Sequence, residues 1–96
     1  MKPEFHPAAA RELSAAVQSG EDHTGGLGAE LKAEAHRVTA ILCNAPLIGE
    51  ALGQSYRRMP LRRFPFALIY RIDGDRLRII AIAHRRRRPG YWIQRK

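Results

Sequence analysis

The sequence predicts an α+β domain in which a helical hairpin packs on a small antiparallel sheet of three to four strands. Residues 8–45 repeat apolar side chains at the 3.6-residue spacing of amphipathic helices. Residues 56–84 instead contain short runs of aromatic and β-branched side chains, which are typical of strands. The chain has 96 residues, so we expect one domain over residues 1–96.

The N-terminal half is expected to form two helices, over residues 8–19 and 29–45. The first helix has an apolar face that contains Leu13, and polar residues such as Glu12 occupy the opposite face. The glycine-rich stretch 20–28 is predicted to end this helix and to form a loop. Because two helices joined by a short loop pack side by side, these elements predict a helical hairpin.

The C-terminal half is expected to form strands over residues 56–61, 66–72 and 76–84. The sequence Asp73-Gly74-Asp75 predicts a tight turn that pairs the last two of these strands. The middle residues of these two strands are apolar on both faces. We therefore expect the two strands to lie at the centre of the sheet, with the helices covering one face of the sheet. Residues 2–5 could add an edge strand, the position where a proline is tolerated.

The charge is distributed unevenly along the chain, whose net charge is +8. Residues 1–50 contain four basic and seven acidic residues, whereas residues 51–96 contain thirteen basic and two acidic residues. A half with this excess of positive charge attracts RNA, DNA or an acidic protein segment. Arginine accounts for all but one of its basic residues, and arginine favours bidentate contacts to phosphate and carboxylate groups.

Several classes of protein are disfavoured by the composition. No apolar stretch is long enough for a membrane span, and the N-terminus lacks the apolar run of a signal peptide, so we expect a cytoplasmic protein without a membrane partner. Cys43 is the only cysteine, which rules out an internal disulfide. We expect no cofactor, because a domain of this size has little room for one beside its core. We expect no metal, because Asp73 and Asp75, the only acidic residues of the basic half, belong to the predicted turn.

The stretch AHRRRRPGYW, residues 83–92, follows directly from the last predicted strand. A run of charge at a chain end is usually solvated, but here the strand holds its beginning in place. Tyr91 and Trp92 are expected to fold back, with Trp92 against the domain edge, because exposure of two aromatic side chains is unfavourable. Residues 85–92 are therefore predicted to form a basic loop that is presented to a partner.

These segments together resemble a known family. The stretches FHPAAARELSAAV, GLGAEL, NAPLIGEAL, LRRFPFALIYRIDGDRLRIIAIAH and RRRRPGYW are similar to toxins of the RelE/ParE superfamily, from bacterial type II toxin–antitoxin modules. The resemblance covers Phe5 to about Arg95, and the parts RRFPFALIYRI and AHRRRRPGYW are its most specific segments. It implies the family fold, a helical hairpin on a small sheet.

The resemblance also implies a function. It is closer to the ParE-like side, also called plasmid stabilisation proteins, whose members inhibit DNA gyrase without cutting nucleic acid. It implies a cognate antitoxin that wraps and neutralises the toxin. A RelE-like endonuclease that cuts mRNA on the ribosome is the alternative, and a non-toxic nucleic-acid-binding domain is a second alternative, because a fold does not fix a function. We therefore expect a binding protein rather than an enzyme.

The candidate residues for partner or nucleic-acid binding are arginines and aromatic residues of the basic half. They are Arg57, Arg58, Arg62, Arg63, Arg71, Arg85, Arg86, Arg87, Arg88, Tyr91 and Trp92.

If the protein acts by binding, no residue is assigned a catalytic role. An endonuclease would draw on His84, Tyr91, Arg71 and Arg87. The imidazole of His84 could act as acid or base near neutral pH, and the arginines could bind phosphates. The resemblance implies that RelE-like nucleases use lysines at positions where this chain has arginine or apolar residues. Arginine cannot donate a proton usefully at neutral pH, which argues against a strong ribosome-dependent nuclease.

Overall fold

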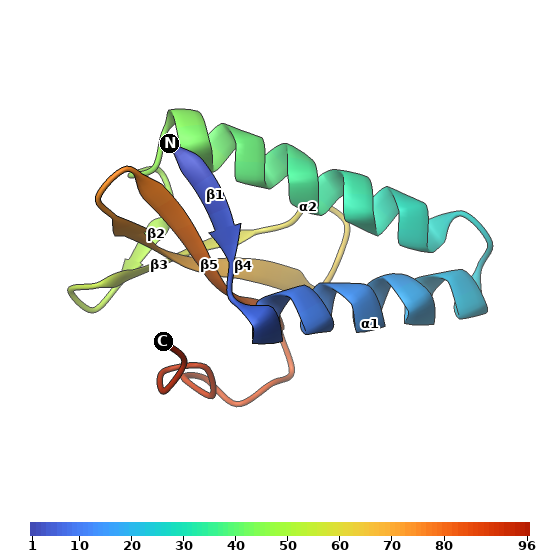
Figure 1. Cartoon of the computed structure of the whole chain (residues 1–96). Coiled ribbons are helices and arrows are strands. Elements are labelled where there is room, and N and C mark those ends of the chain that lie inside the picture. Colours follow the sequence, from blue (N-terminus) through green and yellow to red (C-terminus); the bar gives the residue numbers. More distant parts are fainter.

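Two helices and five strands form along the chain, and the computed structural model describes all of residues 1–96. The elements are β1 (Lys2–Phe5), α1 (Pro7–His23), α2 (Leu27–Asn44), β2 (Glu50–Leu52), β3 (Tyr56–Pro60), β4 (Phe66–Asp73) and β5 (Arg76–His84). The hairpin of α1 and α2 projects to one side of the sheet (Figure 1). Neither helix combines the length and the apolar character that a membrane span requires.

The sheet has five strands in the order β1-β5-β4-β3-β2, so the prediction of a three- to four-stranded antiparallel sheet was wrong in two respects. The sheet is mixed, because the edge strand expected at residues 2–5 is present but runs parallel to β5, with Phe5 opposite Ile79. It also gains β2, which pairs with β3. β2 has only three residues, which is too short for an alternating pattern to be recognised.

α1 is longer than the predicted helix 8–19, and Gly20 lies inside it. A Cβ atom at Gly20 would lie 3.2 Å from the backbone nitrogen of Gly28 in α2. A Cβ atom at Gly28 would lie only 2.2 Å from the carbonyl oxygen of Val17. The two glycines therefore let the helix backbones approach closely, and the loop predicted over residues 20–28 shortens to a turn.

The remaining bounds differ from the predictions by at most two residues. The predicted range was 29–45; α2 begins two residues earlier, at Leu27, and ends one residue earlier, at Asn44. β3 ends at Pro60 instead of residue 61, and β4 continues to Asp73. β5 has the predicted bounds.

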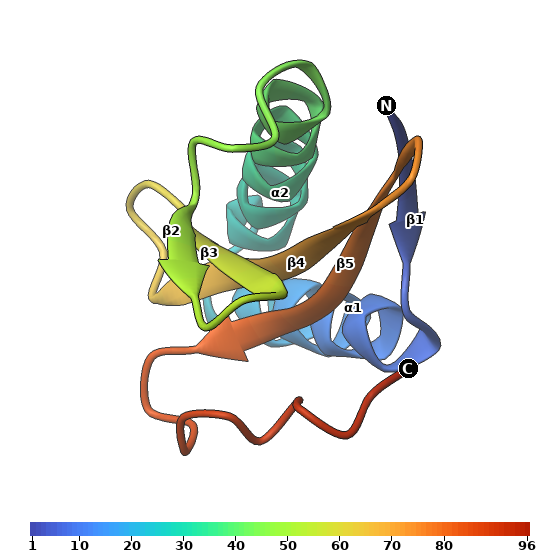
Figure 2. The same cartoon turned by 90° about the vertical axis from the view of Figure 1, so that its left-hand side faces the viewer.

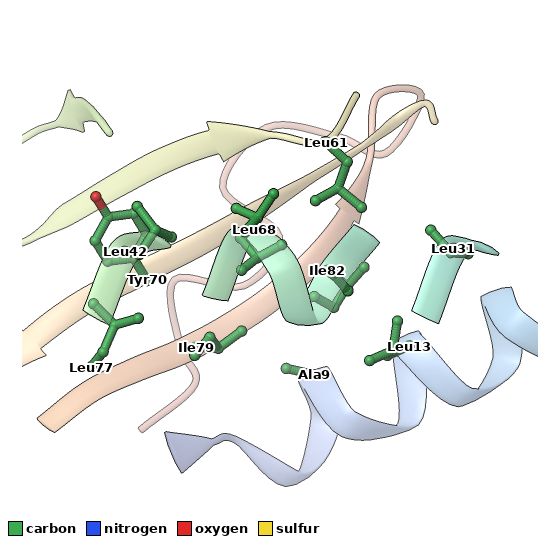
Figure 3. Packing of buried hydrophobic residues seen from close by; sticks show 12 residues of the cluster. Ala9, Leu13, Leu31, Leu42, Leu61, Leu68, Tyr70, Leu77, Ile79 and Ile82 are labelled. Carbon is green, nitrogen blue, oxygen red and sulfur yellow. The ribbon is translucent and has the colours of Figure 1, made fainter. Parts of the chain in front are cut away.

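The main core fills the space between the helices and one face of the sheet, as expected. Figure 3 shows side chains of both helices directed toward side chains of β4 and β5. The buried members are Ala9, Leu13, Leu31, Ala35, Val38, Leu42, Leu61, Leu68, Tyr70, Leu77, Ile79 and Ile82. This core holds α1 at a fixed position against β5, which matters for the site described below.

A bulge in β5 interrupts the alternation of its side chains. Ile69 lies opposite Ala81 and Tyr70 lies opposite Ile79, so Ile80 is an extra residue on this strand. Ile79 and Ile82 belong to the core under the helices, whereas Ile80 and Ala81 belong to a second buried cluster. The bulge thus gives the sheet a second apolar surface, which the helices do not cover.

The close approach of the helices generates a prediction about stability. Gly28→Ala is expected to lower the free energy of unfolding by about 1–3 kcal/mol, because the added methyl group collides with the carbonyl oxygen of Val17. Gly25→Ala is the matched control, since a Cβ atom there would meet nothing within 4 Å. Urea unfolding of the two variants measures the difference, and equal midpoints would contradict the proposed close contact.

Candidate functional site

The segment after β5, residues 85–96, runs back across the sheet, and we call it the C-terminal strap. Successive turns shape it, because the N–H groups of Arg87, Tyr91, Ile93 and Arg95 each donate to a carbonyl oxygen three residues earlier. Gly90 has a positive φ of 78°, a conformation that glycine adopts without strain. Figure 2 shows the strap along the lower side of the molecule, with α2 on the upper side.

Trp92 anchors the strap to the second apolar surface of the sheet. This residue is 7% exposed and packs in a cluster with Ile69, Ile80 and Ala81. The Tyr56 ring meets the indole edge to face, with ring centroids 4.7 Å apart. The expected inward folding of this aromatic residue is therefore present, and it covers a face of the sheet rather than the domain edge.

A single carboxylate, that of Glu12 in α1, connects the helix to β5 and to the strap. Glu12 accepts hydrogen bonds from the backbone N–H of Ile82 at 3.0 Å and from the Tyr91 hydroxyl at 2.7 Å. It also accepts two hydrogen bonds from the Arg95 guanidinium, each 2.8 Å long. Arg95 donates in addition to the carbonyl oxygen of Ile80 at 3.0 Å. Glu12 and Arg95 thus satisfy backbone groups of β5 that lie beyond the end of β1.

This arrangement changes the pKa values of the groups involved. Burial raises the pKa of Glu12, but the hydrogen bonds from Arg95, Tyr91 and Ile82 outweigh burial and leave that pKa below its usual value. Burial and the hydrogen bond to Glu12 raise the pKa of the Tyr91 hydroxyl to about 12. Two guanidinium groups lie near the ring of Tyr91, that of Arg87 at 3.9 Å and that of Arg95 at 5.0 Å from the ring centroid.

A groove of about 920 Å³ lies between the strap, the β3–β4 connection and the exposed face of the sheet. Apolar and aromatic side chains line most of it, and it is lined by four arginines but by no aspartate or glutamate. Its lining side chains are Leu52, Gln54, Ser55, Tyr56, Arg58, Pro60, Phe64, Pro65, Phe66, Ala67, Ile69, Ala83, His84, Arg85, Arg87, Arg88, Pro89, Tyr91, Trp92 and Ile93. We call this the basic groove.

The basic groove gathers six of the eleven residues predicted to bind partners: Arg58, Arg85, Arg87, Arg88, Tyr91 and Trp92. None of these four arginines forms an ion pair. Arg86 belongs to the same run, but it does not line the groove.

The other predicted arginines lie elsewhere and several have internal partners. Arg57 donates to the carbonyl oxygens of Leu47 and Gly49, and so ties down the connection between α2 and β2. Arg71 forms an ion pair with Asp73 at 2.9 Å. The remaining two belong to the β3–β4 connection: the backbone N–H of Arg62 donates to Glu34, and Arg63 lies 3.4 Å from Glu30.

The four residues proposed for an endonuclease are only partly brought together. His84, Arg87 and Tyr91 line the basic groove, whereas Arg71 does not. Phe66 pairs with His84 across the sheet, and Arg71 lies five residues further along β4, which corresponds to roughly 16 Å. His84 accepts a hydrogen bond at Nδ1 from the backbone N–H of Arg86, and its ring packs edge to face on Phe66.

Glu12 is the residue of this site that the sequence did not reveal. Helical periodicity assigns Glu12 to the polar face of the first helix. This pattern separates apolar from polar positions, but it does not indicate which distant residue a charged side chain contacts. Its partners Ile82, Tyr91 and Arg95 lie at least 70 residues away in the sequence. The only available signal was that α1 has a single acidic residue in its first three turns, in a chain whose C-terminus is strongly basic.

Residues 4–89 match the protein family described as "ParE toxin of type II toxin-antitoxin system, parDE". The chain belongs to the ParE toxin family. The resemblance to the RelE/ParE superfamily that the sequence motifs indicated is thereby confirmed.

A solved structure described as "Chromosomal ParDE TA system from P. aeruginosa" contains a chain similar to this ParE-family protein. The TM-score is 0.64, the sequences are 17% identical, and the match covers 88% of this chain and 95% of that chain. At this identity the likeness concerns the fold. A search of curated proteins finds no significant match.

The carboxylate of Glu12 generates a prediction about the strap. Glu12→Gln removes the ion pair with Arg95, so it is expected to cost about 1.5–3 kcal/mol of stability and to shift the emission of Trp92, the only tryptophan, to longer wavelength. Glu30→Gln is the control, because Glu30 is an exposed acid whose contact with Arg63 is 3.4 Å long. An emission spectrum of Glu12→Gln identical to that of the unaltered protein would contradict the anchoring role.

The lowered pKa of Glu12 generates a prediction about pH. A carboxylate with a lowered pKa in the folded state contributes stability above its unfolded value, here 4.5, and the contribution disappears as the pH falls through the folded-state pKa. The free energy of unfolding is therefore expected to decrease between about pH 5 and pH 3, and less steeply in Glu12→Gln. Urea unfolding across this range tests it, and parallel curves for the two proteins would refute the assignment to Glu12.

Proposed function

We propose that this chain is the toxin of a type II toxin–antitoxin module, that it arrests growth by binding DNA gyrase in the cytoplasm, and that a cognate antitoxin neutralises it. Membership of the ParE toxin family supports the general class. The gyrase target and the antitoxin come from the resemblance to ParE-like proteins, and the geometry of the basic groove supports a binding mechanism.

The observation that carries the binding mechanism is the state of Tyr91. Its hydroxyl donates to Glu12 at 2.7 Å, and burial together with this hydrogen bond raises its pKa to about 12, further from neutrality than that of an ordinary tyrosine. A general acid or base works best when its pKa lies near the pH of the reaction. Tyr91 is therefore a structural residue of the strap in this proposal, and the arginines of the groove serve contact rather than proton transfer.

An mRNA endonuclease remains the alternative, and the position of His84 is the observation that favours it. His84 lines the basic groove together with Arg85, Arg87 and Arg88, and its Nε2 atom has no hydrogen-bond partner within the chain. An imidazole beside several cations is a reasonable acid or base for phosphodiester cleavage. Two observations weigh against this alternative. Arg71 does not line the groove, and the hydroxyl of Tyr91 is hydrogen-bonded to Glu12.

The gyrase proposal predicts loss of supercoiling activity. Purified protein mixed with DNA gyrase and relaxed plasmid is expected to inhibit supercoiling at a concentration comparable to that of the enzyme, because the proposed inhibitor acts by forming a complex. Gel analysis of plasmid topoisomers measures the effect, with heat-denatured protein as the control. Full gyrase activity at concentrations that arrest growth would refute the target.

The binding mechanism also predicts which variants keep their activity. His84→Ala is expected to arrest growth as the unaltered protein does, because the imidazole transfers no proton in this proposal. Growth curves and mRNA integrity are followed in the same culture. Loss of arrest in His84→Ala, together with cleaved mRNA in the unaltered strain, would move the function to the ribosome. Absence of arrest in every strain would favour the non-toxic binding domain.

A further inference from the structure

We propose that His6 and His84 form a proton-sensitive latch for the C-terminal strap, and that mild acidification releases the strap from the sheet. His6 lies at the corner where β1 turns into α1, and His84 is the last residue of β5, where the strap begins. Because residues of the strap form one wall of the basic groove, release of the strap would dismantle the groove. The latch would operate in the same way whatever partner the groove binds.

Both imidazoles accept a backbone hydrogen bond at the same ring atom. Nδ1 of His6 accepts from the N–H of Ala8 at 3.0 Å, and Nδ1 of His84 accepts from the N–H of Arg86 at 3.0 Å. A ring nitrogen that accepts a hydrogen bond carries no proton, so both rings are neutral in this arrangement. Protonation of either ring would turn the acceptor into a donor that faces another donor, and the hydrogen bond would be lost. Each histidine therefore closes its turn only in the neutral form.

The surroundings of His6 connect this histidine to the strap. The charged groups near its ring come from three elements: Arg11 and Glu12 of α1, Arg78 of β5 and Arg95 of the strap. Protonation of His6 would remove the side-chain cap from the first turn of α1 and place a cation at a helix N-terminus, where positive charge is unfavourable. It would also place a positive charge near Arg95, the guanidinium that Glu12 binds. The attachment of the strap to α1 would therefore weaken.

The surroundings of His84 connect this histidine to the groove. Its carbonyl oxygen accepts from the N–H of Arg87 at 2.9 Å, so its main chain and its side chain both close the first turn of the strap. Its ring meets Phe66 of β4 edge to face. The charged groups that line the groove beside it are all arginines: Arg58 of β3 and Arg85, Arg87 and Arg88 of the strap. Protonation would remove the side-chain acceptor from this turn and add a positive charge to a surface that holds no acid.

The direction of the pH effect follows from the state of His6. Burial, followed by the charges of the nearby arginines, lowers the pKa of His6 below its ordinary value of 6.5, and only the charge of Glu12 opposes this shift. The neutral ring therefore stabilises the closed strap above pH 6.5, and this contribution is lost as the pH falls. Each proton taken up on release raises the equilibrium constant for opening by up to about tenfold per pH unit.

The emission of Trp92 tests the latch, because Trp92 is the only tryptophan and anchors the strap. Emission of the purified full chain is expected to move to longer wavelength between about pH 7.5 and pH 5.5, while far-UV circular dichroism stays that of the folded protein. This window lies above the one expected for Glu12. No shift of emission, or loss of helical signal over the same range, would overturn the release of the strap alone.

The four histidines of the chain provide a matched pair of double variants. His6→Asn with His84→Asn keeps an acceptor oxygen at both turns but removes the titration, so it is expected to abolish the shift. His23→Asn with His36→Asn removes two exposed imidazoles, at the end of α1 and within α2, and is expected to leave the shift unchanged. Equal shifts in the two double variants would overturn the assignment to His6 and His84.

Nuclear magnetic resonance of the unaltered protein tests the latch without any substitution, and so does not depend on the folding of the variants. The amide signals of Ala8 and Arg86 are expected to titrate together with the emission of Trp92, because these two N–H groups lose their acceptors. The amide of Gly26, which donates to the carboxylate of Glu21, is the control and is expected to stay constant, since the pKa of Glu21 is lowered. Constant signals of Ala8 and Arg86 over this range would overturn the proposal.

Discussion

The carboxylate of Glu12 is the point on which the functional half of this structure depends. It joins three parts of the chain that are distant in sequence: α1, the free edge of β5 and the C-terminal strap. Each of its contacts is short and involves a charged group, which makes them stronger than ordinary hydrogen bonds. Without this carboxylate, the strap would be held mainly by the packing of Trp92, and the wall of the basic groove that contains Arg87 would lose its support.

The need for that carboxylate follows from the length of β1. β1 pairs with β5 as far as Ile79, and the backbone of His6 then donates to Ile79 as the chain turns into α1. The next polar groups on this edge of β5 have no strand beside them, and buried backbone groups without partners are costly. Glu12 lies in the second turn of the helix that starts at this corner, where its side chain can reach Ile82. Because β1 is short, backbone groups of β5 are left without a neighbouring strand. Because α1 begins directly after β1, the side chain of Glu12 is placed where it can form hydrogen bonds with that edge.

The sequence predicted the elements that local patterns determine. Helical periodicity and a turn sequence were sufficient for the hairpin of helices and for the central strands, because their signals lie within a few residues of each other. The parallel pairing of β1, the three-residue strand β2 and the bulge at Ile80 depend on contacts across the whole fold, and no local pattern encodes them. The same limit applied to the site: the basic run was visible, but Glu12 and the groove exist only once α1 and the strap meet.

Charge is also sorted by the fold in a way that composition alone cannot express. Glu4 pairs with arginines of β5, Glu12 with Arg95, Glu30 with Arg63 and Glu34 with Arg37. Four of the seven acidic residues of the N-terminal half are therefore paired with arginines, and three of these pairs hold β1, the strap or the β3–β4 connection to the rest of the molecule. The arginines of the groove form no ion pair within the chain, and they face a surface that contains no acid. Positive charge without an acidic neighbour is thus concentrated in this groove, where it can speed encounter with a negatively charged partner.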